Sequence, residues 1–352
     1  MCREKRVLQR GGAMNERYDY MDWLRVFSIV AVVGVHVVSK IINSAATDEW
    51  AWQFANVIDS GLRWCVPIFF MLSGALLLTR HPDEPVGDFL KKRLSKLLIP
   101  LVVWSGFYMV YNVMELGKSY TAWEMVKLFL TDDVYYHLWF MYTILGLYLM
   151  APFLRILVHY MSKAAFQWLL GFWLLFSAIL PFFPKYLGFE LAVPAGLFSP
   201  YIGYFMLGAY LVMYPLAKKH LVWLGAAAVL GYIATIWGTA ALTNQAGELD
   251  EFYYEHYRPN AFFISLFLFV LFQKLSDRLN PNPIITRISM ATLGIYVIHP
   301  LIQLYLNKFF GINETMIHPA FGIPVSWMLI FLISLGIILV LQKIPVIKNI
   351  VP

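Results

Sequence analysis

Cysteine and charge are both scarce in this chain of 352 residues. Its two cysteines, Cys2 and Cys65, exclude a disulfide scaffold and any cysteine-based zinc site. Only 14% of the residues are charged and 60% are hydrophobic, whereas a soluble domain has about 25% charged and about 45–50% apolar residues. The composition therefore excludes an ordinary soluble domain and predicts an all-α polytopic membrane protein.

Common catalytic and binding signatures are also missing. The sequence contains no HExxH, no P-loop, no GxSxG and no dinucleotide fingerprint, and we expect no metal site. The net charge of +6 comes from basic residues spread along short connections rather than gathered on one face. This distribution argues against a nucleic-acid partner and is typical of a protein that is oriented in a membrane.

Long apolar stretches dominate what is present. Each is near the ~20 residues that a bilayer requires, and no linker between them is long enough to separate two soluble domains. We predict ten spans, at residues 23–42, 61–79, 97–116, 135–153, 165–182, 197–214, 221–242, 260–275, 291–310 and 323–342.

The basic residues alternate between the two sides of these predicted spans. The N-terminal tail and every second connection hold 19 of the 27 Lys and Arg residues, and the opposite connections hold seven. The positive-inside rule then places both termini in the cytoplasm. The connection 243–258, which carries Glu248, Asp250, Glu251 and Glu255, is predicted to lie outside.

Residues 1–20 are predicted to be a basic cytoplasmic tail, and residues 21–345 the membrane domain. The tail is not typical of a cleavable signal peptide, because the apolar run after it is too long and has no small-residue cleavage site. The segment 10–13 could be encoded by purine-rich codons that resemble a ribosome-binding site, so translation could start at Met14 instead.

The first predicted span carries an arginine near its start and a histidine well inside it. Arg25 and His36 are eleven positions apart, which places both on one helix face, about 16 Å apart along the axis. Ionisable groups in a membrane span are costly and normally mark function. Arg25 could alternatively reach the headgroups as a snorkelling side chain, whereas His36 lies too deep for that.

The second span and the segment before the third are patterned as well. Pro67 is expected to kink the second span, and Ser73 with Gly74 permits close backbone approach, for packing or for function. Arg93 and Lys96 lie one turn apart at a helix entrance. They could be ordinary cytoplasmic charge or a binding site for a phosphate-bearing molecule.

Two further histidines lie in or near spans. His137 precedes Trp139, an expected interfacial anchor, and could be either a solvated interfacial residue or a catalytic one. His299 is followed by Pro300 near mid-depth. It could hydrogen-bond the helix that the proline breaks, or act in catalysis.

Together these stretches resemble the acyltransferase-3 family of bacterial integral-membrane acyltransferases, from Asp22 to about Gln342. The compact layout is similar to stand-alone O-acetyltransferases of surface glycans, such as the enterobacterial common antigen enzyme. The sequence departs from the family where the second position of a frequent Arg-x-x-Arg pair is Lys96. The resemblance rests on Asp22-x-Leu24-Arg25 with the Arg-x10-His spacing to His36, on Val66-Pro-Ile-Phe-Phe-Met-Leu-Ser-Gly74, on Arg93-x-x-Lys96 with Pro100, on Tyr136-His-Leu-Trp-Phe140 and on Ile295-Tyr-Val-Ile-His-Pro300.

The resemblance implies transfer of an acyl group, usually acetyl, from cytoplasmic acyl-CoA to a hydroxyl of a surface or lipid-linked glycan, in the bacterial cytoplasmic (inner) membrane. His36 would be a general base or would carry the acyl group. The alternatives are a glycan exporter or flippase, a succinyl-transferring protein, or a structural membrane subunit, and the oligomeric state is open. The implied catalytic residues are Arg25, His36, His137 and His299. The implied acetyl-CoA-binding residues are Arg25, Arg93 and Lys96. Four further residues are expected to line the substrate path or to hold its structure, namely Asp22, Arg63, Ser73 and Trp139.

Overall fold

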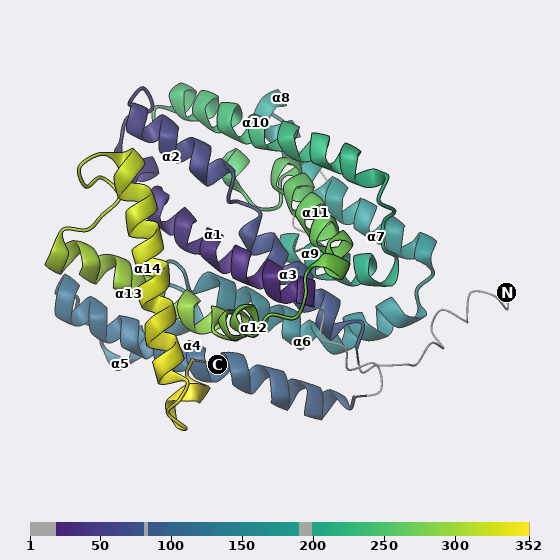
Figure 1. Ribbon diagram of the computed structural model, residues 1–352, viewed down its shortest axis with the longest axis horizontal. Helices are drawn as coiled ribbons and strands as arrows, with labels where there is room; N and C mark the ends of the chain where they lie inside the picture. The colour runs from purple at the N-terminus through teal and green to yellow at the C-terminus, as the bar shows by residue number, and fades with distance from the viewer. Residues whose placement is uncertain (1–18, 81–83, 190–198, 352) are drawn as a thin grey trace.

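Helices form all the regular structure in the residues that this computed structural model describes, which are 19–80, 84–189 and 199–351 (Figure 1). The predicted all-α class is therefore confirmed. Most of the predicted basic tail, including the alternative start at Met14, lies outside the described residues. The long helices are α1 (Asp19–Ser44), α2 (Trp50–Ser60), α3 (Cys65–Leu77), α4 (Val86–Leu116), α6 (Trp139–Tyr160), α7 (Lys163–Leu174), α9 (Pro200–Met213), α10 (His220–Ala246), α11 (Pro259–Lys274), α13 (Thr292–Phe310) and α14 (Pro319–Leu341); the short ones are α5 (Ala122–Leu130), α8 (Phe182–Leu187) and α12 (Pro283–Met290).

Each of the ten predicted spans corresponds to a helix, but not every helix is long enough to cross a bilayer by itself. Within the described residues, seven helices or continuous helix pairs are long and apolar enough, and an eighth is added if α12 and α13, bent by 65°, form one span. Helices α9 and α11 have only 14 and 16 residues. The chain is a multi-pass membrane protein whose described residues contain seven or eight candidate spans, and ten spans with cytoplasmic termini stay a prediction.

One local prediction was wrong. Residues 86–96, before the third predicted span, are not a connection, because α4 begins at Val86 and buries Phe89 on its inner face while its lysines stay exposed. Pro67 lies in the first turn of α3, where a missing N–H costs little. The helix is interrupted at residues 61–64, between α2 and α3, so a break lies directly before the proline at which the sequence predicted a kink.

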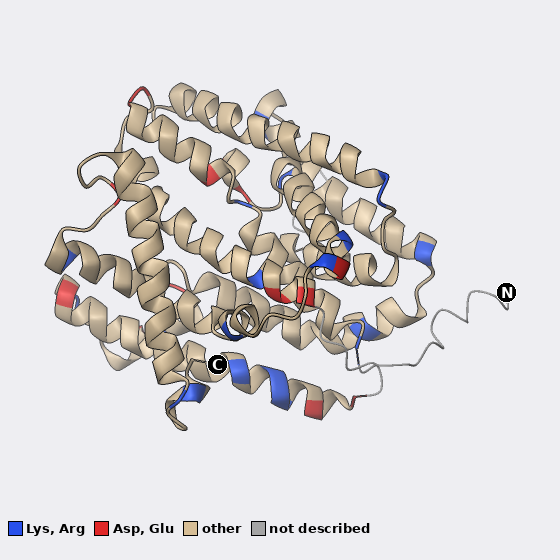
Figure 2. Ribbon diagram, in the orientation of Figure 1, with Lys and Arg blue, Asp and Glu red and all other residues tan. Residues whose placement is uncertain are grey.

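Helix α1 lies in the middle of the bundle (Figure 1) and contacts α2, α3, α11, α12, α13 and α14. It is apolar on nearly all sides, as a helix surrounded by protein must be. Leu24, Ile29, Val33 and Val37 are completely buried. Charged residues lie mainly at helix ends and in connections, which leaves the middles of the helices apolar (Figure 2).

Helices α3 and α9 touch backbone to backbone. A Cβ atom on Gly74 would lie 1.6 Å from the carbonyl oxygen of Phe205, and one on Gly208 would lie 1.8 Å from that of Met71. Only glycine fits at such a crossing, which is a common way for membrane helices to approach closely. The contact confirms the close approach expected at Gly74, and it holds α3 so that the neighbouring Ser73 faces a cavity.

Candidate active site

Three predicted histidines, far apart in the sequence, meet in the interior. His36 comes from α1, His137 from the turn before α6 and His299 from α13. The ring centroids of His36 and His299 are 5.0 Å apart, and those of His137 and His299 are 5.8 Å apart. His137 and His299 are buried, and His36 is partly exposed. The interpretation of His137 as a solvated interfacial residue is therefore wrong.

Pro300 explains how His299 is oriented. Because proline has no N–H, the carbonyl oxygen of Tyr296 loses its usual partner four residues later in the helix. Nδ1 of His299 lies 2.7 Å from that oxygen. A carbonyl oxygen can only accept, so Nδ1 carries the proton and Nε2 of the neutral ring has a free lone pair. Nε2 is buried and has no hydrogen-bond partner among the described residues.

Tyrosines surround this histidine cluster, and of the three named here only Tyr296 lies in a stretch that the sequence analysis singled out. The ring of His137 lies 5.0 Å from that of Tyr108, 5.5 Å from that of Tyr135 and 5.3 Å from that of Tyr296. The Tyr296 hydroxyl also donates a hydrogen bond to the backbone carbonyl of His137. This bond ties α13 to the turn before α6 and so fixes two of the three histidines relative to each other.

Arg25 is held at the start of the same helix as His36. Its Nη1 lies 3.0 Å from Oδ1 of Asp22 and 3.5 Å from the hydroxyl of Ser289, and that hydroxyl donates to the same carboxylate oxygen at 2.7 Å. Asp22 is buried and the Arg25 side chain is 26% exposed. The Asp22 contact thus positions Arg25 within the protein, and Ser289 ties α12 to α1.

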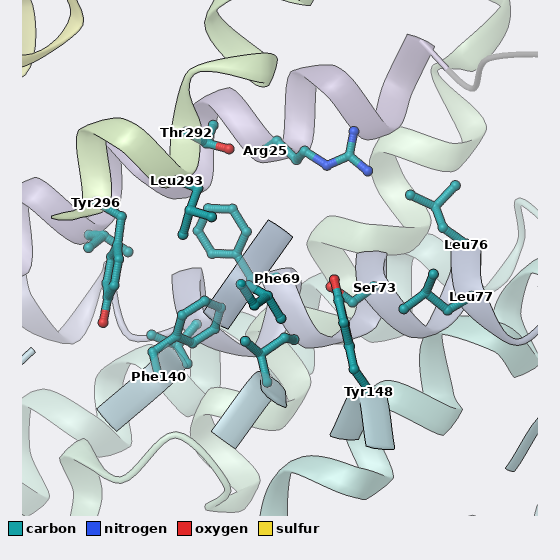
Figure 3. A pocket seen from close by; sticks show the side chains of 14 residues that line it. Arg25, Phe69, Ser73, Leu76, Leu77, Phe140, Tyr148, Thr292, Leu293 and Tyr296 are labelled. Atoms are coloured by element: carbon teal, nitrogen blue, oxygen red, sulfur yellow. The ribbon is translucent and has the colours of Figure 1, made fainter. Parts of the chain in front are cut away.

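A cavity of about 220 Å³ extends from Arg25 to Tyr296 (Figure 3), whose ring lies 5.3 Å from that of His137 and 6.1 Å from that of His299. Tyr296 is at one end of the lining, and Arg25, Ser73 and Tyr148 are toward the other, where the Ser73 and Tyr148 hydroxyl groups meet. Most of the wall is apolar. The lining residues are Arg25, Val32, Val66, Phe69, Ser73, Leu76, Leu77, Leu97, Phe140, Ile144, Tyr148, Thr292, Leu293 and Tyr296.

Arg63 and Trp139 do not line this cavity. Arg63 is paired with the buried Asp59, and its guanidinium lies 3.9 Å from the centre of the Tyr254 ring. Trp139 lies 6.1 Å, ring to ring, from His256. His256, which no sequence pattern singled out, is in the connection before α11. Burial and the nearby Arg63 lower its pKa to about 3, so this imidazole is neutral at physiological pH.

The two residues of α4 that were expected to bind acetyl-CoA, Arg93 and Lys96, differ in their surroundings. Nη1 of Arg93 forms an ion pair with Oε1 of Glu84 at 2.8 Å, and its guanidinium lies 4.9 Å from the centre of the Phe89 ring. Lys96 is exposed. Among the described residues, no group of three His, Cys, Asp or Glu side chains is placed to hold a metal ion.

The fold and this site define a class, a multi-pass membrane protein in which a cavity extends from an interior arginine to a tyrosine that packs against two buried histidines. Comparison of sequences gives the family. The acyltransferase-3 model, described as an acyltransferase domain, matches residues 18–343, so the chain belongs to this family. No solved structure matches the chain significantly.

Two curated relatives are similar to parts of the chain. A Bacillus subtilis (strain 168) protein, YfiQ, described provisionally as a membrane-bound acyltransferase, is 25% identical over 49% of this chain and 46% of its own length. An amino-acid racemase of Enterococcus faecalis is 27% identical over 36% of this chain and 17% of its own length. The chain therefore aligns with less than half of each of these relatives.

Proposed function

We propose that this membrane acyltransferase moves an acetyl group from cytoplasmic acetyl-CoA to a hydroxyl of a cell-surface or lipid-linked glycan, in the bacterial inner membrane. The observation that carries the proposal is the cavity that extends from Arg25 to Tyr296, beside the histidine cluster. A mostly apolar cavity suits a thioester arm that must reach a base in the interior of the bundle. The cluster lies about three helical turns from Arg25 along α1, since His36 follows it by eleven residues.

Neutral imidazoles suit the chemistry of acyl transfer. A sugar hydroxyl loses its proton to an imidazole nitrogen as its oxygen attacks the thioester carbonyl, and the thiolate of CoA leaves and takes up a proton. His36 is the proposed base because it is partly exposed and follows Val32, which lines the cavity, by one turn of α1. His299, whose Nε2 has a free lone pair, is close enough to position or relay that proton.

The same residues also permit a covalent route. An imidazole nitrogen could attack the thioester first, release CoA and carry the acetyl group until the sugar hydroxyl takes it. The two routes use the same donor and the same acceptor. They differ in whether a labelled enzyme forms when the acceptor is left out.

Purified full-length protein in lipid nanodiscs, given acetyl-CoA labelled in the acetyl group and lipid-linked glycans, tests the proposal. We expect release of CoA thiol and transfer of the label to the glycan, with loss of both in His36→Gln. Succinyl-CoA as donor distinguishes acetyl from succinyl transfer. Movement of glycan across vesicles without release of thiol would contradict the proposal and favour an exporter.

A further inference from the structure

The face of α6 that lines the cavity continues to an arginine that the sequence pattern did not single out. Ile144 and Tyr148 line the cavity, and Arg155 follows Tyr148 by seven residues. Seven residues are close to two helical turns, so Arg155 is on the same face of α6, about 10 Å further along the axis. It lies beyond the end of the cavity that is opposite the histidines.

Arg155 and Arg93 both lie against Phe89 at this end. The guanidinium of Arg155 lies 5.2 Å from the centre of the Phe89 ring, and that of Arg93 lies 4.9 Å from the same centre. Nη2 of Arg155 donates to the backbone carbonyl of Glu84 at 2.7 Å, and Nη1 of Arg93 pairs with the Glu84 carboxylate. Arg93 is one turn before Leu97, which lines the cavity, so α4 and α6 lead from the cavity to the same place.

We propose that Arg155, together with Arg93, binds the phosphate-bearing end of the acyl-CoA donor. This inference rests on the proposed CoA donor. Two guanidinium groups suit phosphate oxygens because each presents a planar fork of N–H donors. Lys96 is exposed, whereas Arg155 is 5% exposed and held by Glu84 and Phe89. Arg155 thus supplies the second guanidinium that α4 lacks at position 96.

Glu84 is the acidic partner of the basic residues at this end of the cavity. Its carboxylate pairs with Arg93 at 2.8 Å and with Lys92 at 3.9 Å. An incoming phosphate group carries more negative charge than a carboxylate and offers more acceptor oxygens. We infer that Glu84 keeps Arg93 oriented before the donor arrives and that phosphate competes with it for the guanidinium.

The test compares CoA with pantetheine, which has the same arm but no phosphates, on full-length protein in nanodiscs by isothermal titration calorimetry. Arg155→Gln should weaken CoA binding roughly 10- to 150-fold, the usual range for loss of a charge-assisted hydrogen bond. Its binding of pantetheine should stay within about twofold. Arg155→Lys should recover part of the loss, because it keeps the charge without the fork.

Lys91→Gln, at an exposed position of the same helix as Arg93, is the matched control and should change CoA affinity by no more than about fivefold, since an exposed charge contributes little. Unchanged CoA binding in Arg155→Gln would overturn the inference. Equal losses of affinity for CoA and for pantetheine would show that Arg155 only stabilises the structure, and would also overturn the inference. If Arg155→Gln does not fold, the affinities of Arg155→Lys for CoA and for pantetheine are compared instead. Absence of CoA binding by the unsubstituted protein would instead contradict the proposed donor.

Discussion

The imidazole rings of His36 and His299 lie 5.0 Å apart, centroid to centroid, although α1 and α13 come from opposite ends of the chain. Gln303, one turn beyond His299, donates to the backbone carbonyl of His36 at 3.1 Å and ties the two helices together at this level. The pair can therefore act on one substrate atom, and the two histidines can be tested separately.

His36→Gln should lower turnover by about 10²- to 10⁴-fold, the usual effect of losing acid–base assistance. Donor affinity should change little, because the imidazole is at the end of the cavity away from Arg93 and Arg155. Steady-state transfer and CoA titration measure the two effects. Near-normal transfer by a well-folded His36→Gln protein would remove the catalytic role, and a hydroxylamine-sensitive acetyl label on unsubstituted enzyme without acceptor would favour the covalent route.

His299→Asn and His299→Gln separate the two nitrogens of that ring. Asn can still donate to the freed carbonyl of Tyr296 but has no group in the place of Nε2, whereas Gln reaches toward the Nε2 position. If Nε2 takes part in the reaction, His299→Asn should lower turnover by at least about 10²-fold, and His299→Gln should lose less. Equal, near-normal rates of both variants in a transfer assay would leave His299 only its hydrogen bond to the freed carbonyl of Tyr296.

Val32→Phe should fill part of the cavity of about 220 Å³, because Val32 lines it between Arg25 and His36. A blocked passage keeps the thioester from the histidines, so we expect turnover to fall at least about 10-fold, as misplacement of reacting groups predicts. The control is Val102→Phe on the exposed side of α4, which should transfer normally. Transfer assays on both variants decide whether the cavity is the donor passage.

Cysteines placed at Gln245 and at Lys218 should react from opposite sides of the membrane. Both positions are exposed, at opposite ends of α10, whose 27 residues span about 40 Å. Cys65 is buried and should stay unlabelled, and Cys2 can be replaced by Ser. Impermeant maleimide on intact cells should label only the cysteine at position 245. Labelling of both positions would contradict the predicted topology.

Asp132→Asn should stabilise the protein at pH 7.5 and hardly at all at pH 3.5. Asp132 lies between α5 and α6, and burial, with the nearby Asp133, raises the pKa of its carboxyl from 3.8 to about 6. Since the unfolded state loses the proton more readily than the folded state, the carboxyl costs stability that grows as the pH rises from about 4 and is complete above about pH 6, and the amide avoids this cost. Asn also tolerates the positive φ of 61° at this position. Thermal unfolding at both pH values measures the difference, and the exposed Asp48→Asn should show none.

The sequence by itself determined the helical membrane class, because 60% apolar composition and runs of about 20 apolar residues leave few alternatives. It also determined that Arg25 and His36 share one face of α1, since that follows from helix periodicity alone. The family was recognisable from the ordered motifs, and the family match confirms it.

Only the tertiary structure decided which residues meet. His137 and His299 join His36 because α13 and the turn before α6 pack near α1, and no local spacing encodes a contact between distant helices. For the same reason the sequence did not predict a role for Arg155, which is indistinguishable from other basic residues in the sequence. The packing of α4 and α6 places its guanidinium against the Phe89 ring, which Arg93 also contacts. Local patterns decide which face of a helix carries a residue, and packing between helices decides what that face touches.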